Sequence, residues 1–249
     1  MRNIDINCDL GELDDGSDLL IMPFISSCNI ACGEHAGNAQ LMSKAVLEAI
    51  NHQVVIGAHP GYPDRKNFGR VSVDLAGSEV EELIYNQVVR LQEIALKSNS
   101  TVSYIKLHGA LYHDALTNKA IAQAVISGAS RTGLELRFLG PTNSELEIEA
   151  KAAGLPYHYE AFIDRRYDDK GKLVPRSKPN AVIGDVRGVE GQLLEIVLRE
   201  SVTSISGNKI DLNADSICIH GDHPGAIENA RMIRKILTRE GVSVKSFIG

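Results

Sequence analysis

Acidic, basic and imidazole side chains occur at every second position in several short, otherwise apolar runs of this sequence. Successive side chains of a β-strand point to opposite faces, so residues two apart share a face. Such chemical groups at the end of a strand are suited to acid–base catalysis. Four sets share a face in this way: Asp5, Asn7 and Asp9; Tyr104, Lys106 and His108; His158, Glu160 and Asp164; and Cys218, His220 and Asp222.

Lys106 is the most informative member of these sets. It lies between Ile105 and Leu107, and an ammonium group that faces an interior needs an anionic partner or ligand. We expect that partner to be Asp9, Glu160 or Asp222, which belong to the other sets, and we expect Lys106 to contact an anionic substrate group during turnover.

Further polar residues lie just beyond the apolar runs, where structural roles are the alternative. His35 and His59 lie beside glycines and Pro60, so they could stabilise turns, and Asp9 and Glu12 could cap a loop. Some remaining residues favour structural interpretations. His52, His113 and His158 are expected at helix ends, in loops or in packing. The arginines at 165 and 166 could form surface ion pairs with the aspartates at 168 and 169.

Seven β-rich runs alternate with amphipathic stretches along the chain. Each helical crossover returns the chain to the same edge of a sheet, so alternating units predict parallel strands. Units of roughly 25–50 residues predict a (β/α) barrel with about seven strands, a fold in which active sites lie at the C-terminal strand ends. A doubly wound sheet is the alternative. The expected strands are Ile4–Asp9, Ser26–Cys32, Val54–His59, Val102–His108, Leu134–Leu139, Tyr157–Asp164 and Ser216–His220.

The chain is expected to form a single domain over residues 1–249, with an irregular insertion at about 165–213. The insertion should contain one helix near Glu190–Glu200 and a hairpin of Val202–Ser206 and Lys209–Asn213. Residues 242–248 could form an eighth strand or a packed tail.

Helix starts and apolar stripes can also be predicted from the sequence. Ser78 with Glu81 and Thr142 with Glu145 resemble capping boxes, and Pro224 suits the first position of the last helix. Two apolar helical stripes are expected: Val80, Ile84, Val88, Leu91 and Ile94; and Leu41, Ala45, Val46, Ala49 and Ile50.

The composition excludes several classes of function. The 249 residues include 26 Lys and Arg against 32 Asp and Glu, and this net charge of −6 argues against a nucleic-acid partner. The apolar runs are too short to span a membrane and no signal-peptide pattern is present, so we expect a cytoplasmic protein. The four cysteines form no C-x-x-C pair, and no phosphate-binding, dinucleotide-binding, nucleophile-elbow or H-E-x-x-H motif occurs.

Six motifs, in order along the whole chain, together resemble the LamB/YcsF family. Where the family usually has Asp-Pro, this chain has Asn38-Ala39, so a charged role at that position is in doubt. The motifs are Asp5-Ile-Asn-Cys-Asp-Leu-Gly-Glu12, Asn29-Ile-Ala-Cys-Gly-Glu-His-Ala-Gly37, Gly57-Ala-His-Pro-Gly-Tyr-Pro-Asp64 with Phe68-Gly-Arg70, Lys106-Leu-His-Gly-Ala-Leu-Tyr112, Glu160-Ala-Phe-Ile-Asp-Arg165 and His220-Gly-Asp-His-Pro-Gly-Ala226.

The resemblance implies a barrel similar to the sugar-amide deacetylase and glycosidase barrels. The family is equated with the A subunit of the bacterial ATP-dependent 5-oxoprolinase, so it implies opening of the 5-oxo-L-proline lactam to L-glutamate. It further implies ATP as co-substrate and subunits B and C as partners. Opening the amide needs a base for water, donors for the developing oxyanion and a cation for a carboxylate or phosphate.

Roles can be assigned to these positions only as chemical hypotheses. Asp9 or a histidine could be the base, Lys106 and Arg165 the cations, and His108 or His220 the acid. The full catalytic set is Asp9, Glu12, His35, His59, Lys106, His108, Glu160, His220 and Asp222. The substrate-binding set is Asn7, Arg70, Tyr112, Asp164 and Arg165.

Two alternatives remain open. A stand-alone metal-dependent deacetylase or amidase would bind a divalent metal ion through Asp9, His35 and His59, with water as a further ligand. A sugar- or nucleotide-binding regulatory protein is the third class, although binding alone would not need so many acid–base groups at strand ends.

Overall fold

The centre of the fold is a closed ring of parallel strands. The computed structural model describes residues 2–219 and 226–248. The last strand of the ring pairs with the first, so the predicted (β/α) barrel is confirmed and the doubly wound alternative is wrong. Around the ring the strands are β1 (Asn3–Leu10), β2 (Ser27–Ala31), β3 (Val55–His59), β4 (Tyr104–Ile105), β5 (Arg137–Gly140), β6 (Tyr157–Phe162) and β9 (Ser216–Ile219).

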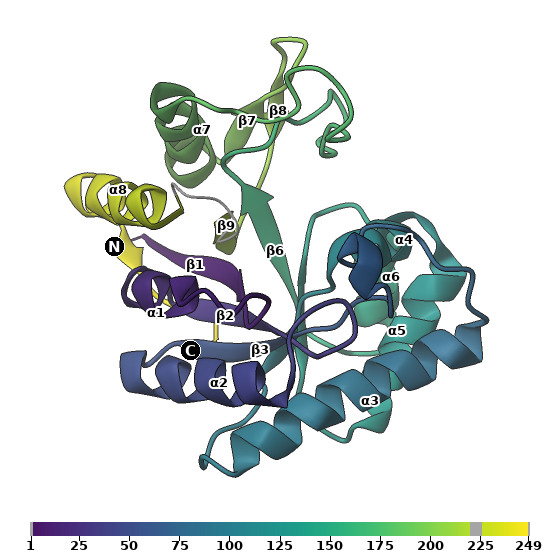
Figure 1. Cartoon of the computed structure of the whole chain (residues 1–249). Helices are drawn as coiled ribbons and strands as arrows, with labels where there is room; N and C mark the ends of the chain where they lie inside the picture. Colours follow the sequence, from purple (N-terminus) through teal and green to yellow (C-terminus); the bar gives the residue numbers. More distant parts are fainter. Residues whose placement is uncertain (1, 220–225, 249) are drawn as a thin grey trace.

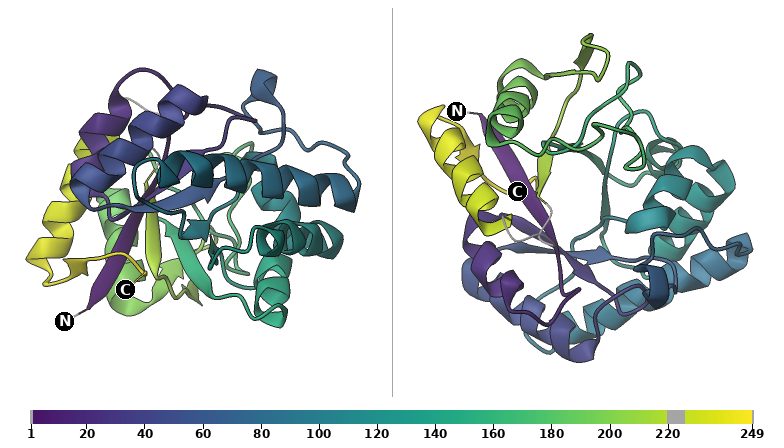
Figure 2. Two further views of the ribbon diagram at one scale, coloured as in Figure 1. Left: turned by 90° about the horizontal axis from the view of Figure 1, so that it is seen from below. Right: turned by 45° about the horizontal axis from the view of Figure 1, so that its top comes forward.

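Helices surround the ring of strands on its outer side (Figures 1 and 2). None of the helices that the structure describes is long and apolar enough to cross a membrane. The α-helices are α1 (Ser17–Ile21), α2 (Ala39–His52), α3 (Gly77–Leu96), α4 (Gly109–Thr117), α5 (Lys119–Arg131), α6 (Glu145–Ala152), α7 (Val186–Arg199) and α8 (Ala226–Arg239), and the short 3₁₀ helices are η1 (Met22–Phe24) and η2 (Arg65–Asn67).

The barrel separates apolar from polar side chains by strand parity. In β1, Ile4, Ile6 and Cys8 are buried in the hydrophobic core, whereas Asp5 and Asn7 are buried among polar partners inside the ring. The stripe predicted for α3 is buried, apart from a half-buried Ile94. In the stripe predicted for α2, Ile50 is 39% exposed, so the prediction for Ile50 is wrong. Met42 is buried in its place.

Both predicted capping boxes are displaced by two residues. Helix α3 begins after Ala76, whose backbone N–H donates to Glu79 at 2.7 Å, while Glu81 instead binds side chains of α5. Helix α6 begins after Ser144, whose hydroxyl accepts from the backbone N–H of Glu147 at 3.1 Å. At α6 a second suitable N-cap residue, Ser144, lies beside Thr142. At α3 the Glu79 carboxylate alone satisfies the backbone N–H at the helix start, because the Ala76 side chain cannot cap. Pro224 lies outside the described residues.

The segment between β6 and β9 departs from the repeating pattern. Its first part is irregular and leads into α7. Two isolated bridges hold it together, one between Arg165 and Val182 and one between Tyr167 and Leu173. An antiparallel hairpin of β7 (Ser201–Thr203) and β8 (Lys209–Asp211) packs beside α7, as Figure 1 shows. The predicted helix and hairpin are therefore both confirmed, with the helix starting four residues earlier than predicted.

The carboxyl-terminal tail closes the amino-terminal end of the barrel. Strand β10 (Ser243–Val244) pairs with the start of β1, so the tail includes a short strand. Beyond it, Phe247 contacts the rings of Tyr104 and His158 with centroids 5.1 and 4.6 Å apart. Gly57 leaves room for the Tyr104 ring, since a Cβ at that position would overlap the ring atoms. The interior is therefore reached from the opposite end.

Candidate active site

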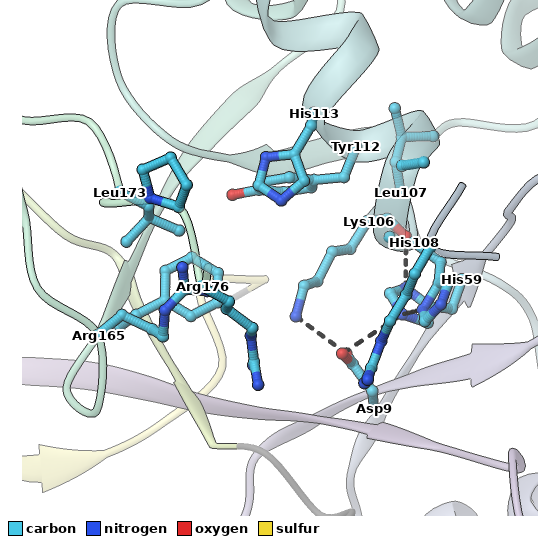
Figure 3. Close-up of a pocket in the computed structure, with 15 residues that line it drawn as sticks. Asp9, His59, Lys106, Leu107, His108, Tyr112, His113, Arg165, Leu173 and Arg176 are labelled. Atoms are coloured by element: carbon cyan, nitrogen blue, oxygen red, sulfur yellow. Dashed lines mark hydrogen bonds and ion pairs between the residues drawn. The ribbon is translucent and has the colours of Figure 1, made fainter. Parts of the chain in front are cut away.

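A cavity of about 480 Å³ lies at the carboxyl ends of the strands. Figure 3 shows Arg165 and Arg176 on the side opposite His59 and His108, with Lys106 between them. Residues of β1, β3, β6, the loop after η2, the β4–α4 region and the irregular segment line it together. They are Asp9, His59, Arg70, Lys106, Leu107, His108, Gly109, Ala110, Tyr112, His113, Phe162, Arg165, Leu173, Pro175 and Arg176.

Lys106 lies at the centre of the polar interior. Its Nζ is 2.9 Å from Asp9 Oδ1, 2.9 Å from Glu160 Oε1, 3.2 Å from Asn7 Oδ1 and 3.1 Å from Cys218 Sγ. These partners come from β1, β6 and β9, so strand parity correctly predicted which residues face one another. The ammonium group has two of the three carboxylate partners expected for it.

Charge pairing outweighs burial in this group. Burial lowers the pKa of the Lys106 ammonium, but Asp9, Cys218 and Glu160 together raise it well above its ordinary value. Burial likewise raises the pKa of Asp9, but His59 and Lys106 hold it well below its ordinary value. Asp9 therefore remains ionised and Lys106 remains charged, as an ion pair with one side on the cavity.

A layer of hydroxyl and amide groups beneath Lys106 orients its partners. Asp5 accepts hydrogen bonds from Ser26 at 2.6 Å, from Ser27 at 2.7 Å and from Ser216. Because Ser216 donates its proton to Asp5, its oxygen accepts from Asn7 Nδ2 at 2.8 Å. The Asn7 carbonyl oxygen is thereby turned toward the ammonium of Lys106.

Asn29 continues this layer toward Asp9. Its Oδ1 accepts from the Tyr104 hydroxyl at 2.7 Å, so its Nδ2 is the atom that faces the site. That Nδ2 donates to Asn7 Oδ1 and to Asp9 Oδ1, each at 2.8 Å. The orientations of Asn7 and Asp9, two of the groups that contact Lys106, are thus fixed from below.

Asp5 should make the stability of the protein depend on pH. Burial raises its pKa to about 6, because the serine donors only partly offset desolvation. A carboxyl group whose pKa is raised by folding stabilises the fold most at low pH, and this contribution is lost as pH rises through about 6. The free energy of unfolding of the native protein, compared with that of the Asp5→Asn variant, should fall by ~3 kcal/mol between about pH 4 and pH 7. Urea unfolding measures this difference, and parallel profiles for the two proteins would contradict it.

Two histidines at the cavity wall have their rings fixed by backbone carbonyl groups. His59 Nδ1 lies 2.7 Å from the Lys106 oxygen, and His108 Nε2 lies 2.8 Å from the Phe68 oxygen. The other two nitrogens, His59 Nε2 and His108 Nδ1, are 3.0 Å apart. His59 Nε2 is also 3.3 Å from Asp9 Oδ2. Both rings therefore present one nitrogen to the site.

His35 and Glu12 complete this group. The His35 ring stacks on His108 with centroids 3.7 Å apart, and Glu12 Oε1 lies 3.3 Å from His35 Nε2 and 3.4 Å from His108 Nδ1. Burial lowers the pKa of His35 strongly and that of His108 to about 3. One ligand atom from each of Glu12, His35, His59 and His108 lies within 4.8 Å of the others, a group that could hold a metal ion.

The structure groups other residues with two of the metal ligands considered from the sequence, which were Asp9, His35 and His59. His35 and His59 belong to the observed group, but Glu12 and His108 take part in place of Asp9. Asp9 Oδ1 is bound to Lys106 and Asn29, while its Oδ2 lies 3.3 Å from His59 Nε2.

The opposite wall of the cavity is cationic and partly apolar. Arg165 is only 4% exposed, and its Nη2 donates to the Val174 carbonyl oxygen at 2.8 Å. The surface pairing considered for Arg165 is therefore wrong, and Asp168 instead accepts backbone N–H groups of its own turn. Burial and the charge of Arg176 lower the pKa of Arg165, while the nearby Asp164 partly offsets them.

The remaining predicted residues have distinct positions. Tyr112 lines the cavity, and its hydroxyl donates to Glu160 Oε2 at 3.3 Å. Arg70 also lines the cavity, and its guanidinium lies 5.2 Å from the Phe68 ring centroid. Asp164 is half-buried and does not line the cavity. His220 and Asp222 lie outside the described residues, so their place in the site remains a prediction.

Two ionisable residues that line the cavity, His113 and Arg176, were not predicted from the sequence. His113 was expected to pack or lie in a loop, but it lines the cavity from the first turns of α4. Its position five residues after His108, in the first half of a helix that follows a strand, was the available signal. Arg176 lies in the irregular segment, where no strand or helix pattern indicates which way a side chain points.

Comparisons with known proteins agree with this architecture. The model of the LamB/YcsF family matches residues 4–249. The A subunit of 5-oxoprolinase from Staphylococcus carnosus (strain TM300) is 40% identical over 250 residues, covering 99% of both chains. The crystal structure of the lactam utilization protein from Thermus thermophilus superposes with a TM-score of 0.94 and 35% identity, over 99% of this chain and 100% of that one. The chain therefore belongs to the LamB/YcsF family.

Proposed function

We propose that this chain opens the lactam ring of 5-oxo-L-proline to give L-glutamate. In this proposal it acts with subunits B and C of a 5-oxoprolinase, and the reaction converts ATP to ADP and phosphate. The observation that carries the proposal is the 40% identity to the A subunit of a 5-oxoprolinase over nearly the whole length of both chains. The charged cavity at the strand ends supports it, because amide hydrolysis needs such groups.

The chemistry explains why ATP is required. A five-membered lactam is almost unstrained, so its hydrolysis is poorly driven. Phosphorylation of the amide oxygen makes the carbonyl carbon more electrophilic, so water can add to it. The C–N bond then breaks as the nitrogen takes up a proton, and hydrolysis of the resulting acyl phosphate releases phosphate and glutamate. The sequence has no G-x-x-x-x-G-K-[ST] loop to hold nucleotide phosphates. We therefore expect this chain alone to hydrolyse neither ATP nor 5-oxo-L-proline.

Lys106 and Asp9 are assigned the central roles. The Lys106 ammonium lies at the cavity wall, where it can stabilise negative charge on the lactam oxygen. Asp9 stays ionised beside it and can accept a hydrogen bond or a proton from the attacking water. Glu160 and Asn7 hold the ammonium in place beneath them.

Arg165 is assigned to the substrate carboxylate. Its Nε is buried, and among residues 2–219 and 226–248 no hydrogen-bond acceptor meets it. A planar guanidinium suits a carboxylate, and a hydrogen bond to a charged group contributes about 1.5–3 kcal/mol. The position across the cavity from His59 separates carboxylate binding from the reacting bond (Figure 3).

Substitution Arg165→Met should raise the KM for 5-oxo-L-proline by about 10- to 100-fold, the loss expected for one charged hydrogen bond. The matched control is 2-pyrrolidinone, the same ring without the carboxylate, whose weaker turnover should not change. Steady-state kinetics of the reconstituted assembly measure both. An equal loss for the two lactams would instead make Arg165 a structural residue.

The overall proposal is tested by measuring glutamate released from 5-oxo-L-proline while each component is omitted in turn. We expect release only when this chain, subunits B and C and ATP are all present. Ready lactam opening by this chain alone, without ATP, would contradict the proposal.

A stand-alone metal-dependent amidase or deacetylase is the second candidate function. The group of Glu12, His35, His59 and His108 favours it, because imidazole and carboxylate ligands beside a cavity are typical of hydrolytic metal sites. This candidate predicts hydrolysis that depends on added metal and is indifferent to ATP. The same omission experiment, repeated with Zn²⁺, distinguishes the two.

A further inference from the structure

Two imidazole nitrogens, one from His59 and one from His108, face each other at the edge of the cavity. A carbonyl oxygen can only accept a hydrogen bond, so His59 Nδ1 and His108 Nε2 must carry protons. In the neutral rings the lone pairs then lie on His59 Nε2 and His108 Nδ1, which are 3.0 Å apart. Two lone pairs at this distance repel unless a positive species lies between them.

The number of converging atoms indicates which positive species fits. A single proton bridges two atoms, whereas four ligand atoms meet here within 4.8 Å of one another. Glu12 Oε1 is 3.4 Å from His108 Nδ1 and 3.3 Å from His35 Nε2. A carboxylate beside three imidazoles gives the group a negative charge that a divalent cation neutralises.

We propose that Glu12, His35, His59 and His108 bind one divalent transition-metal ion, with Zn²⁺ the best match to this ligand set. Three imidazoles and one carboxylate are ligands that Zn²⁺ accepts, at bond lengths of about 2.0–2.2 Å. Ligand atoms around a tetrahedral ion at that distance lie about 3.3 Å apart. Three pairs already lie near this distance: His59 with His108 at 3.0 Å, His35 with Glu12 at 3.3 Å and His108 with Glu12 at 3.4 Å. The other pairs of ligand atoms would move closer together when the ion binds.

The surroundings hold the imidazoles in place as they do around known metal ions. Backbone carbonyl groups fix His59 and His108, and such partners on the second ring nitrogen orient metal-binding histidines. Gly61 and Gly69 allow the backbone to pack against the rings, because a Cβ at either position would lie 2.7 Å from His35. His35 Nδ1 meets no hydrogen-bond partner in the described part of the chain, so the group bound at Nε2 sets its tautomer.

The site adjoins the cavity that contains the proposed reactive groups. His59 and His108 line that cavity, and His59 Nε2 is 3.3 Å from Asp9 Oδ2. If the proposed function holds, an ion bound here would supply Lewis-acid activation of the lactam oxygen or of water. The ion-binding inference itself depends only on the four ligand residues.

Metal binding is measured on the full chain after treatment with a chelator. Titration with Zn²⁺ in a calorimeter should show one tight site, and Co²⁺ should give the visible absorption of an imidazole-rich site. Substitution His108→Ala should weaken Zn²⁺ binding at least about 100-fold. His52→Ala removes an exposed histidine on α2 and serves as the matched control, with no expected change. If His108→Ala unfolds, Glu12→Gln gives the same test with smaller structural effect.

Two results would overturn the metal site. One is Zn²⁺ binding that is no tighter than a surface histidine provides and is lost in His52→Ala. The other is a ring proton between His59 and His108, detected by ¹⁵N NMR, that Zn²⁺ does not displace. Glutamate formation by an assembly containing metal-free chain would then separate the two proposals, since the lactam reaction could stand while the metal site failed.

Discussion

Substitution Lys106→Met should reduce glutamate formation by the complete assembly at least about 100-fold, the scale of one deleted electrostatic stabiliser. Methionine keeps the length of the side chain but removes the charge that the lactam oxygen is proposed to contact. The substitution also leaves Asp9 and Glu160 facing each other without the ammonium that now lies 2.9 Å from each. Breaking a buried pair in this way costs about 3–5 kcal/mol of stability, so activity must be measured on the folded fraction.

A double variant separates catalysis from folding. Lys106→Met combined with Glu160→Gln removes the cation together with one buried carboxylate. We expect most of the lost unfolding free energy to return while glutamate formation stays low. Normal turnover in the folded double variant would show that Lys106 is structural and would remove it from the proposed mechanism.

Substitution Asp9→Asn should lower kcat by about 10²- to 10⁴-fold, the range for losing a positioned proton acceptor, with little change in KM. The amide retains the shape of the side chain, and its oxygen can still accept from Lys106. It cannot accept a proton from water. His59 and Lys106 keep the pKa of Asp9 low, so the ionised carboxylate is the form that the amide replaces.

The matched control for this substitution is Asp14→Asn in the loop after β1. Asp14 is 79% exposed, and its only described ion pair is a weak contact with Lys44 at 3.9 Å. We expect this control to retain normal kinetics. A larger effect on KM than on kcat in Asp9→Asn would mean that Asp9 binds substrate rather than acting on water.

The polar interior could be predicted because strand parity is a local rule. Once β1 and β4 are recognised, the alternation of apolar and polar residues places Asp9 and Lys106 on inward faces. Parallel strands then bring the ends of all such faces to one mouth of the barrel. The contacts of Lys106 with Asp9 and Glu160 follow from these two facts and needed no knowledge of loops.

The histidine group could be predicted only in part, because Glu12 and His35 lie in loops. Parity ends where a strand ends, and it cannot show that Glu12 turns toward His108 while Asp9 turns toward Lys106. Arg176 lies in irregular chain and gave no signal for the same reason. The displaced helix starts after Ala76 and Ser144 show a related limit, since the helix can begin at a residue other than the one that local capping preferences favour.

We propose that the lactam is opened in the cavity between Lys106 and Arg165. A structure of this chain assembled with subunits B and C and containing bound 5-oxo-L-proline tests it most directly. We expect the lactam oxygen within hydrogen-bond distance of Lys106 Nζ and the carboxylate against the Arg165 guanidinium. A lactam bound outside this cavity, or bound with its ring carbonyl turned away from Lys106, would contradict the account.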